Sequence, residues 1–115
     1  MFRFALILIM SLAVSSQAVA AVKWNNSGGG PFQKATTAYE NGDYSAAFHI
    51  FTSLAEKGDR VAQFNLAKMY REGRGVSKNY ETAVNWFGLS AEQGNALAQY
   101  HLGVAYSFGL GVVPN

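Results

Sequence analysis

The amino-acid sequence predicts an all-α protein, an α/α solenoid of about two and a half helical hairpins with right-handed superhelical stacking. The first observation is a repeat: residues 58–79 match residues 94–115 at nine of twenty-two positions, an offset of 36. A period of this length is typical of solenoids, in which each hairpin buries its apolar face against its neighbours. The second observation is that a possible capping residue directly follows a glycine at three expected helix starts, Asp43, Asp59 and Asn95.

The first hairpin is expected over residues 32–58. Its first helix is predicted over about residues 32–41, because apolar side chains recur there at helical spacing. A tight turn follows, and Asp43 is the expected cap of the second helix. Gly58 is the expected end of that helix, since glycine readily adopts the positive φ found after helix ends.

A complete repeat is expected over residues 59–94. Asp59 is predicted to cap its first helix, which ends at Gly73, where the residue after the helix needs a positive φ. A loop then leads to Asn79, the expected cap of the second helix, and Gly94 ends that helix. The repeated alanines within these helices are expected at points where neighbouring helices approach closely.

An incomplete repeat is expected over residues 95–115, with one helix from Asn95 to Phe108. Asn115 aligns with Asn79, so the sequence ends where a second helix would begin. Two explanations stay open: the chain is a truncated piece of a longer array, or its exposed end pairs with another molecule. In either case the sequence predicts apolar side chains without their usual cover, namely Phe108, Leu110, Val112 and Val113.

Residues 1–20 are predicted to be a signal peptide. A positively charged start precedes an apolar run, Phe4–Val14, and Ala18–Ala20 supplies small residues before a cut ahead of Ala21. A membrane anchor is the alternative, but a spanning helix needs about 20 apolar residues, roughly twice the length of this run. We therefore expect a periplasmic or secreted protein with no membrane insertion after cleavage. Residues 21–31 are glycine-rich and are expected to form a flexible linker.

The charge of the chain argues against a nucleic-acid partner. Nine Lys and Arg stand against seven Asp and Glu, and removal of Arg3 with the leader leaves eight against seven. The remaining cations are scattered rather than gathered in a stripe, and no aromatic platform is interleaved with them. The chain has no cysteine, so no disulfide framework is expected.

No catalytic, cofactor or metal site is predicted. Nucleophilic catalysis needs a base beside a nucleophile and a third group that orients the base. The two histidines, His49 and His101, fall at repeat positions that asparagine occupies elsewhere, so we expect them to be solvated or hydrogen-bonded rather than catalytic. A metal site needs three or four ligands at suitable spacing, and the sequence holds no such cluster. The Gly73-x-Gly75 pair lacks the strand and the Gly-Lys-Ser/Thr of a phosphate loop.

The segment from Asp59 to Asn115 closely resembles the Sel-1-like repeat, a relative of the tetratricopeptide repeat with a longer inter-helix loop. The resemblance is carried by Gly73-x-Gly75-Val76, Asn79-Tyr80, Trp86-Phe87 and their counterparts 36 residues later. Residues 32–58 have a shorter turn and resemble an ordinary tetratricopeptide hairpin. The resemblance implies a solenoid that scaffolds protein–protein contacts. Some secreted members of the family carry a cysteine pair in each hairpin. This chain has none, so the penicillin-binding or β-lactamase-like activity reported for them is not expected here.

The likeness to hairpin solenoids implies that the first helix of each repeat lines the binding face. One stripe on each such helix lies beside the apolar core positions and differs between the two repeats, as expected of a surface adapted to a ligand. A merely solvated surface is the alternative. The candidate partner-binding residues are Asn65, Lys68, Glu72, His101, Val104 and Phe108.

These features predict an exported helical-repeat scaffold that binds a protein or peptide, with no catalysis and no cofactor of its own. Self-association through the uncapped C-terminal end is a further expectation. Two alternatives stay open. One is a secreted hydrolase acting on cell-wall or β-lactam substrates, and the other is a non-functional fragment of a longer repeat array.

Overall fold

The computed structural model describes residues 30–112. The predictions for the signal peptide, for residues 21–29 of the linker and for Val113 to Asn115 lie outside this range. Within it the chain forms five helices and no strand. The helices are α2 (Pro31–Glu40), α3 (Tyr44–Glu56), α4 (Arg60–Glu72), α5 (Tyr80–Glu92) and α6 (Ala96–Phe108). Each predicted helix is present with its ends within one or two residues of the expected positions. Pro31, the last residue of the predicted linker, begins α2, because proline suits the first turn of a helix.

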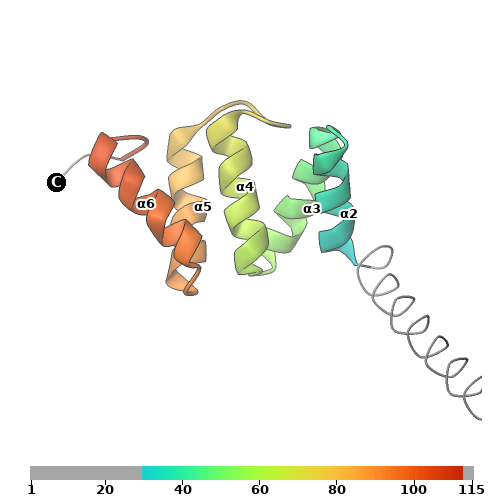
Figure 1. Ribbon diagram of the computed structural model, residues 1–115, viewed down its shortest axis with the longest axis horizontal. Helices are drawn as coiled ribbons and strands as arrows, with labels where there is room; N and C mark the ends of the chain where they lie inside the picture. Colours follow the sequence, from blue (N-terminus) through green and yellow to red (C-terminus); the bar gives the residue numbers. More distant parts are fainter. Residues whose placement is uncertain (1–29, 113–115) are drawn as a thin grey trace, which may run out of the picture.

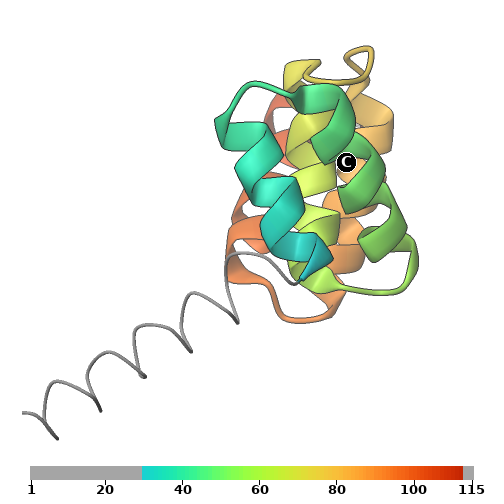
Figure 2. The same cartoon turned by 90° about the vertical axis from the view of Figure 1, so that its right-hand side faces the viewer.

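The helices form two layers, with α2, α4 and α6 on one side and α3 and α5 on the other (Figure 1 and Figure 2). Each helix packs against the helix that follows it in the sequence. The predicted all-α solenoid of about two and a half hairpins is therefore confirmed. The layer of α2, α4 and α6 consists of the first helix of each hairpin, and it carries the candidate partner-binding residues.

The predicted caps all form. The carboxylate of Asp59 accepts from the backbone N–H groups of Val61 and Ala62, both at 2.9 Å. The side chains of Asp43, Asn79 and Asn95 accept from the backbone N–H groups at the starts of α3, α5 and α6. A cap of this kind stabilises a helix by about 1 kcal/mol. The boundaries are thus set by local contacts that the sequence reveals directly.

Two glycines shape the loop between α4 and α5. Gly73 has a φ of 70° and follows the last residue of α4, which confirms its role as a helix exit. Gly75 has a φ of 74° and lies against the backbone of Tyr44 at the start of α3, where a Cβ would come within 2.8 Å of the Tyr44 carbonyl carbon. The second glycine is therefore required by a tertiary contact as well as by its own conformation. Gly111 lies in the same way against Tyr80 at the start of α5.

The core consists of two hydrophobic clusters that share α4. The first joins α2, α3 and α4 through Ala35, Ala47, Phe51, Ala55, Ala62, Leu66 and Met69. The second joins α4, α5 and α6 through Ala67, Ala83, Phe87 and Ala98. Tyr70 and Trp86 pack against both clusters. Five of the repeated alanines are at most 2% exposed (Ala47, Ala55, Ala62, Ala83 and Ala98), and Ala91 is half-buried, which supports their role in close helix approach.

Polar side chains bind the ends of the helices to one another. Gln63 is buried on α4 and donates to the carbonyl of Ala55 in α3 at 3.2 Å. The repeat-equivalent Gln99 on α6 makes the same bond to Ala91 in α5, also at 3.2 Å. These bonds give a structural reason for the identical glutamines in the two repeats.

The C-terminal end is only partly uncovered. Phe108 is 74% exposed, as expected from the missing second helix. The expectation that Leu110 also lacks cover is wrong, because the loop after α6 folds back on α5. Gly111 contacts the Tyr80 backbone there, and Leu110 is half-buried beside Tyr80 and Phe87. Val112 is half-buried as well.

Candidate partner-binding face

The six candidate residues lie on two helices of the same layer. Asn65, Lys68 and Glu72 come from α4, and His101, Val104 and Phe108 come from α6. One candidate residue reaches the other helix: His101 of α6 contacts the side chains of Phe64 and Arg71 on α4. Phe108 lies at the far end of α6 and is largely exposed. We call the surface formed by α4 and α6 in this layer the α4/α6 face.

Several polar residues of the candidate set are already engaged within the chain. The amide of Asn65 donates to the carbonyl of Val61 one turn earlier in α4, at 3.1 Å. The ammonium of Lys68 lies 5.8 Å from the centre of the Phe64 ring, a cation–π geometry. The carboxylate of Glu72 is surrounded by donors, as described next. These residues therefore form an ordered surface.

Glu72 is the acceptor at the centre of a polar network that joins α2, α4 and the following loop. Its carboxylate accepts from the hydroxyl of Tyr39 at 3.3 Å and from the guanidinium of Arg71 at 3.2 Å. Arg74 lies 3.5 Å from the same carboxylate and donates to the Tyr39 hydroxyl at 2.8 Å. Burial, partly offset by the hydrogen bond from Arg74, raises the pKa of Tyr39. Because these ion pairs are partly exposed, they orient side chains more than they stabilise the fold.

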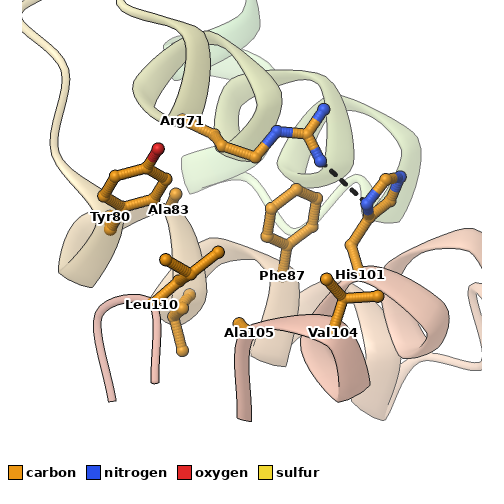
Figure 3. Close-up of a pocket in the computed structure, with 9 residues that line it drawn as sticks. Arg71, Tyr80, Ala83, Phe87, His101, Val104, Ala105 and Leu110 are labelled. Atoms are coloured by element: carbon orange, nitrogen blue, oxygen red, sulfur yellow. Dashed lines mark hydrogen bonds between the residues drawn. The ribbon is translucent and has the colours of Figure 1, made fainter. Parts of the chain in front are cut away.

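His101 lies between two aromatic rings and a guanidinium. Its ring stacks on Phe87 with centroids 5.2 Å apart and is tilted against Phe64 at 5.7 Å. Nδ1 lies 2.8 Å from Nη1 of Arg71, a hydrogen bond in which the neutral imidazole accepts (Figure 3). Burial and the nearby charges of Arg71 and Lys68 lower the pKa of His101 below 6.5. The expectation of a hydrogen-bonded histidine is confirmed here, whereas His49 is exposed.

A small cavity lies beneath His101. Its volume is about 30 Å³, close to the volume that one water molecule occupies. Val104 and Ala105 of α6, Phe87 of α5 and Leu110 line it (Figure 3). Val104 thus faces this cavity and is half-buried. The enclosed space beside His101 is therefore small.

The structure reveals exposed apolar residues that sequence reasoning missed. Val61 on α4 is 41% exposed, and Leu97 and Tyr100 on α6 are 60% and 66% exposed. Val61 and Leu97 face an open groove of about 390 Å³ between the N-terminal halves of α4 and α6, which Phe64 and Asn65 also line. The available signal was that Val61 and Leu97, and Phe64 and Tyr100, fall at equivalent repeat positions.

Within the described residues we looked for a metal site, a membrane-spanning helix and buried polar groups without a partner. Within residues 30–112, no three His, Asp or Glu side chains gather as a metal ion would require. No helix in that range is long and apolar enough to cross a membrane. Every buried side-chain nitrogen or oxygen in the described part of the chain has a hydrogen-bond partner. The α4/α6 face with its open groove is therefore the strongest candidate site.

Comparison with protein-family models assigns this helical-repeat architecture to a known family. The Sel1 repeat model matches residues 37–59, 60–95 and 96–115, which together cover more than half of the chain. The chain belongs to the Sel1 repeat family. The first match begins within α2, so the shorter first hairpin is also recognised as a Sel1 repeat. No curated protein matched the sequence.

Two solved structures share this fold. A protective antigen present in uropathogenic Escherichia coli strains is 33% identical, with a TM-score of 0.69, over 74% of this chain and 19% of that one. A Sel1 repeat protein from Oxalobacter formigenes is 39% identical, with a TM-score of 0.61, over 63% of this chain and 21% of that one. This chain thus spans about a fifth of the length of these two relatives.

Proposed function

We propose that this Sel1 repeat chain is an exported scaffold that binds a segment of a partner protein on its α4/α6 face and catalyses no reaction. Sel1 repeats generally mediate protein–protein interaction, which supports the binding role. The observation that carries the proposal is the exposed apolar row Val61, Leu97 and Tyr100 beside an open groove. A row of exposed apolar side chains on a small chain marks an interaction surface.

The groove also indicates the chemistry of the bound segment. Val61, Phe64 and Leu97 supply an apolar surface that can take an aliphatic or aromatic side chain. The ammonium of Lys68 lies over the Phe64 ring at one side of this surface. A partner segment that carries an apolar residue followed by a carboxylate would satisfy both. We therefore propose an extended peptide with an apolar anchor and a neighbouring acidic residue.

The absence of catalysis in this proposal rests on the surroundings of the histidines. His101 is hydrogen-bonded to Arg71 and stacked between aromatic rings, and a base in that position needs a nearby nucleophile to act. Ser90 is fully buried, and its hydroxyl donates to the Arg60 carbonyl at 2.6 Å, so this serine is not free to act as a nucleophile. Purified protein should therefore leave a chromogenic β-lactam intact. Turnover that is lost on His101→Ala would favour the hydrolase instead.

A peptide-display experiment tests the binding role. A library of random peptides is selected on immobilised protein that spans residues 21–115. We expect enrichment of sequences with an apolar residue near an acidic one, and loss of their binding to the double variant Leu97→Ser/Tyr100→Ser. Leu89→Ser is the matched control, because Leu89 is also exposed but lies on α5. Enriched peptides that bind the double variant as well as the wild type would exclude the α4/α6 face.

A further inference from the structure

His101 faces the preceding repeat rather than the C-terminal end of the chain. Its ring contacts Phe64 and Arg71 on α4 and stacks on Phe87 of α5. The surroundings of the imidazole therefore come from helices that the structure describes, whatever follows α6 in the sequence. The repeat-equivalent residue on α4 is Asn65, whose amide bonds one turn back within its own helix. His101 thus differs from its counterpart in reaching a neighbouring repeat.

The second ring nitrogen of His101 is open to solvent. Nδ1 accepts a hydrogen bond from Nη1 of Arg71 at 2.8 Å, so in the neutral imidazole Nε2 carries the hydrogen. Nε2 points away from Arg71 (Figure 3), and it has no hydrogen-bond partner within residues 30–112. Because every buried side-chain nitrogen in that range has a partner, Nε2 is not buried. An unused N–H donor is thus exposed beside a guanidinium.

The charged groups of α4 that face His101 leave an excess of positive charge. Arg71 and Lys68 both act on the imidazole more strongly than the carboxylate of Glu72 does. That carboxylate already accepts from Arg71 at 3.2 Å and from the hydroxyl of Tyr39 at 3.3 Å. The imidazole is therefore placed where an anion from outside the chain would be favoured.

The other helices packed against His101 contribute rings. Phe87 of α5 stacks on the imidazole, and Tyr80 of α5 lines the small cavity beside it. Tyr100 of α6 lies edge-on, with ring centroids 5.3 Å apart. Among the described residues, Glu72 is thus the one carboxylate that acts on His101.

His101 also adjoins the groove that we assign to the bound peptide. Phe64 lines this groove together with Leu97, and the same ring contacts His101 at 5.7 Å. The ammonium of Lys68 lies 5.8 Å from the centre of that ring. A segment with an apolar side chain in the groove would therefore bring its next residues to Lys68 and His101.

We propose that His101 makes this site selective for a carboxylate of the bound segment and makes binding depend on protonation. The proposal rests on the peptide-binding role of the α4/α6 face. When Nδ1 takes up a proton, it loses the lone pair that accepted from Arg71, so this hydrogen bond breaks and two cations lie side by side. A carboxylate among Arg71, Lys68 and His101 offsets their repulsion and accepts from their N–H groups. Proton uptake and carboxylate binding therefore strengthen each other.

The direction of the pH effect follows from this coupling. Burial, Arg71 and Lys68 lower the pKa of His101 below 6.5 in the free protein, and a bound carboxylate acts in the opposite direction. As the pH falls, the complex takes up the proton before the free protein does, so the affinity rises. An Asp or Glu of the peptide stays ionised at about pH 5.5, because its own pKa lies near 4.

The chain has two histidines, which allows a direct test of the carboxylate site. Protein that spans residues 21–115 is titrated with acid in sodium chloride and in sodium N-acetylaspartate of equal ionic strength, and the imidazole C–H signals are followed by NMR. We expect N-acetylaspartate to raise the pKa of His101 and to leave the titration curve of the exposed His49 unchanged. Lys68→Met should reduce the rise. Lys57→Met, which removes an exposed cation at the end of α3, should not.

Peptide affinity gives the second readout. A peptide enriched in the display selection is labelled with fluorescein, and its binding is measured by anisotropy at about pH 7.5 and about pH 5.5. We expect binding about threefold or more tighter at the lower pH. The gain should disappear in His101→Asn, and also when the peptide's carboxylate is replaced by an amide. Circular dichroism verifies that wild type and variant are folded at both pH values.

The outcomes distinguish this proposal from the binding role on which it rests. Identical His101 titration curves in the two salts, or a gain in affinity that persists in His101→Asn, would overturn it and leave the peptide-binding role intact. A display selection that yields no peptide would remove the peptide-binding role, and this proposal would fall with it even if N-acetylaspartate binds. A raised pKa of His101 together with a gain in affinity that His101→Asn abolishes would support it.

Discussion

Nη1 of Arg71 lies 2.8 Å from Nδ1 of His101, and this contact joins the side chains of two neighbouring helices of one layer, α4 and α6. The guanidinium cannot lose its proton in the physiological range, so the imidazole must accept and must be neutral. Arg71 also donates to Glu72, which continues the polar chain to Tyr39 on α2. The polar network thus reaches all three helices of the layer.

The first prediction is that stability falls in mild acid because of His101. Burial, Arg71 and Lys68 lower its folded-state pKa below 6.5, with Glu72 acting weakly in the opposite direction. Above 6.5 the imidazole is neutral in both states, and the full stabilisation is present. As the pH falls below 6.5, the unfolded chain takes up the proton first, so the free energy of unfolding decreases. Urea unfolding at about pH 7.5 and about pH 5.5 measures this difference.

Two variants serve as controls for the acid effect. His101→Asn places there the residue that stands at the equivalent position of α4 and should flatten the pH dependence. His49→Asn removes an exposed histidine and should leave the dependence unchanged. An equal loss of stability in wild type and His101→Asn between the two pH values would show that other groups cause it.

Local signals explain why so much of the fold could be predicted. Asp59 and Asn79 cap their helices through side chains that reach only two or three residues along the chain, so the sequence alone identifies them. Gly73 likewise follows from the conformation that a helix exit needs. The period of 36 then places equivalent helices in equivalent environments.

The candidate site depends on contacts that the sequence does not display. Arg71 on α4 and His101 on α6 are 30 residues apart in the sequence, and residue spacing alone does not show that their side chains meet. Leu97 and Tyr100 repeat the apolar character of Val61 and Phe64, so they resemble core residues in the sequence. They are nevertheless 60% and 66% exposed, and Val61 is 41% exposed although α6 lies beside α4 in the same layer. The solvent exposure of such apolar side chains depends on how the helices pack in the folded protein, which the sequence pattern does not show.

A second prediction concerns Gly75. Gly75→Ala should destabilise the protein by about 3 kcal/mol, because its Cβ would overlap the Tyr44 backbone in addition to the strain of a positive φ. Gly42→Ala is the matched control, since Gly42 has a φ of 83° but open space around it. That variant should lose only about 1 kcal/mol. Urea unfolding compares them, and equal losses would mean that the loop moves away from Tyr44 at little cost.

A third prediction compares the two repeated glutamines. Gln63→Leu should lower the free energy of unfolding by about 1 to 2 kcal/mol, because it removes bonds to the Ala55 carbonyl and the Gln93 side chain from a buried position. Gln99→Leu should have a smaller effect, since Gln99 is exposed and water can replace its bond to Ala91. Chemical denaturation of the two variants measures the difference. A greater loss for Gln99→Leu would contradict the assignment.

A fourth prediction is that the mature protein begins at Ala21 in an extracytoplasmic fraction. The reason is the arrangement of a positively charged start, an apolar run and small residues before the cut. N-terminal sequencing of the exported protein tests it. Ala20→Lys should block cleavage, because a long charged side chain does not suit the position before the cut, whereas Val19→Leu should not. An intact Met1 in wild-type protein from the membrane fraction would indicate an anchor instead.

The last prediction is that the mature chain self-associates through the exposed end of α6. Phe108 is 74% exposed, and no second helix covers this end of α6 within the described residues. Burial of a phenyl side chain contributes about 1.5 to 3 kcal/mol, which favours contact between molecules at high concentration. Light scattering over a concentration series should show association that Phe108→Ser reduces. Ser107→Ala, at the neighbouring exposed position, should leave it unchanged. A wild-type chain that stays monomeric throughout the series would disprove this role for Phe108.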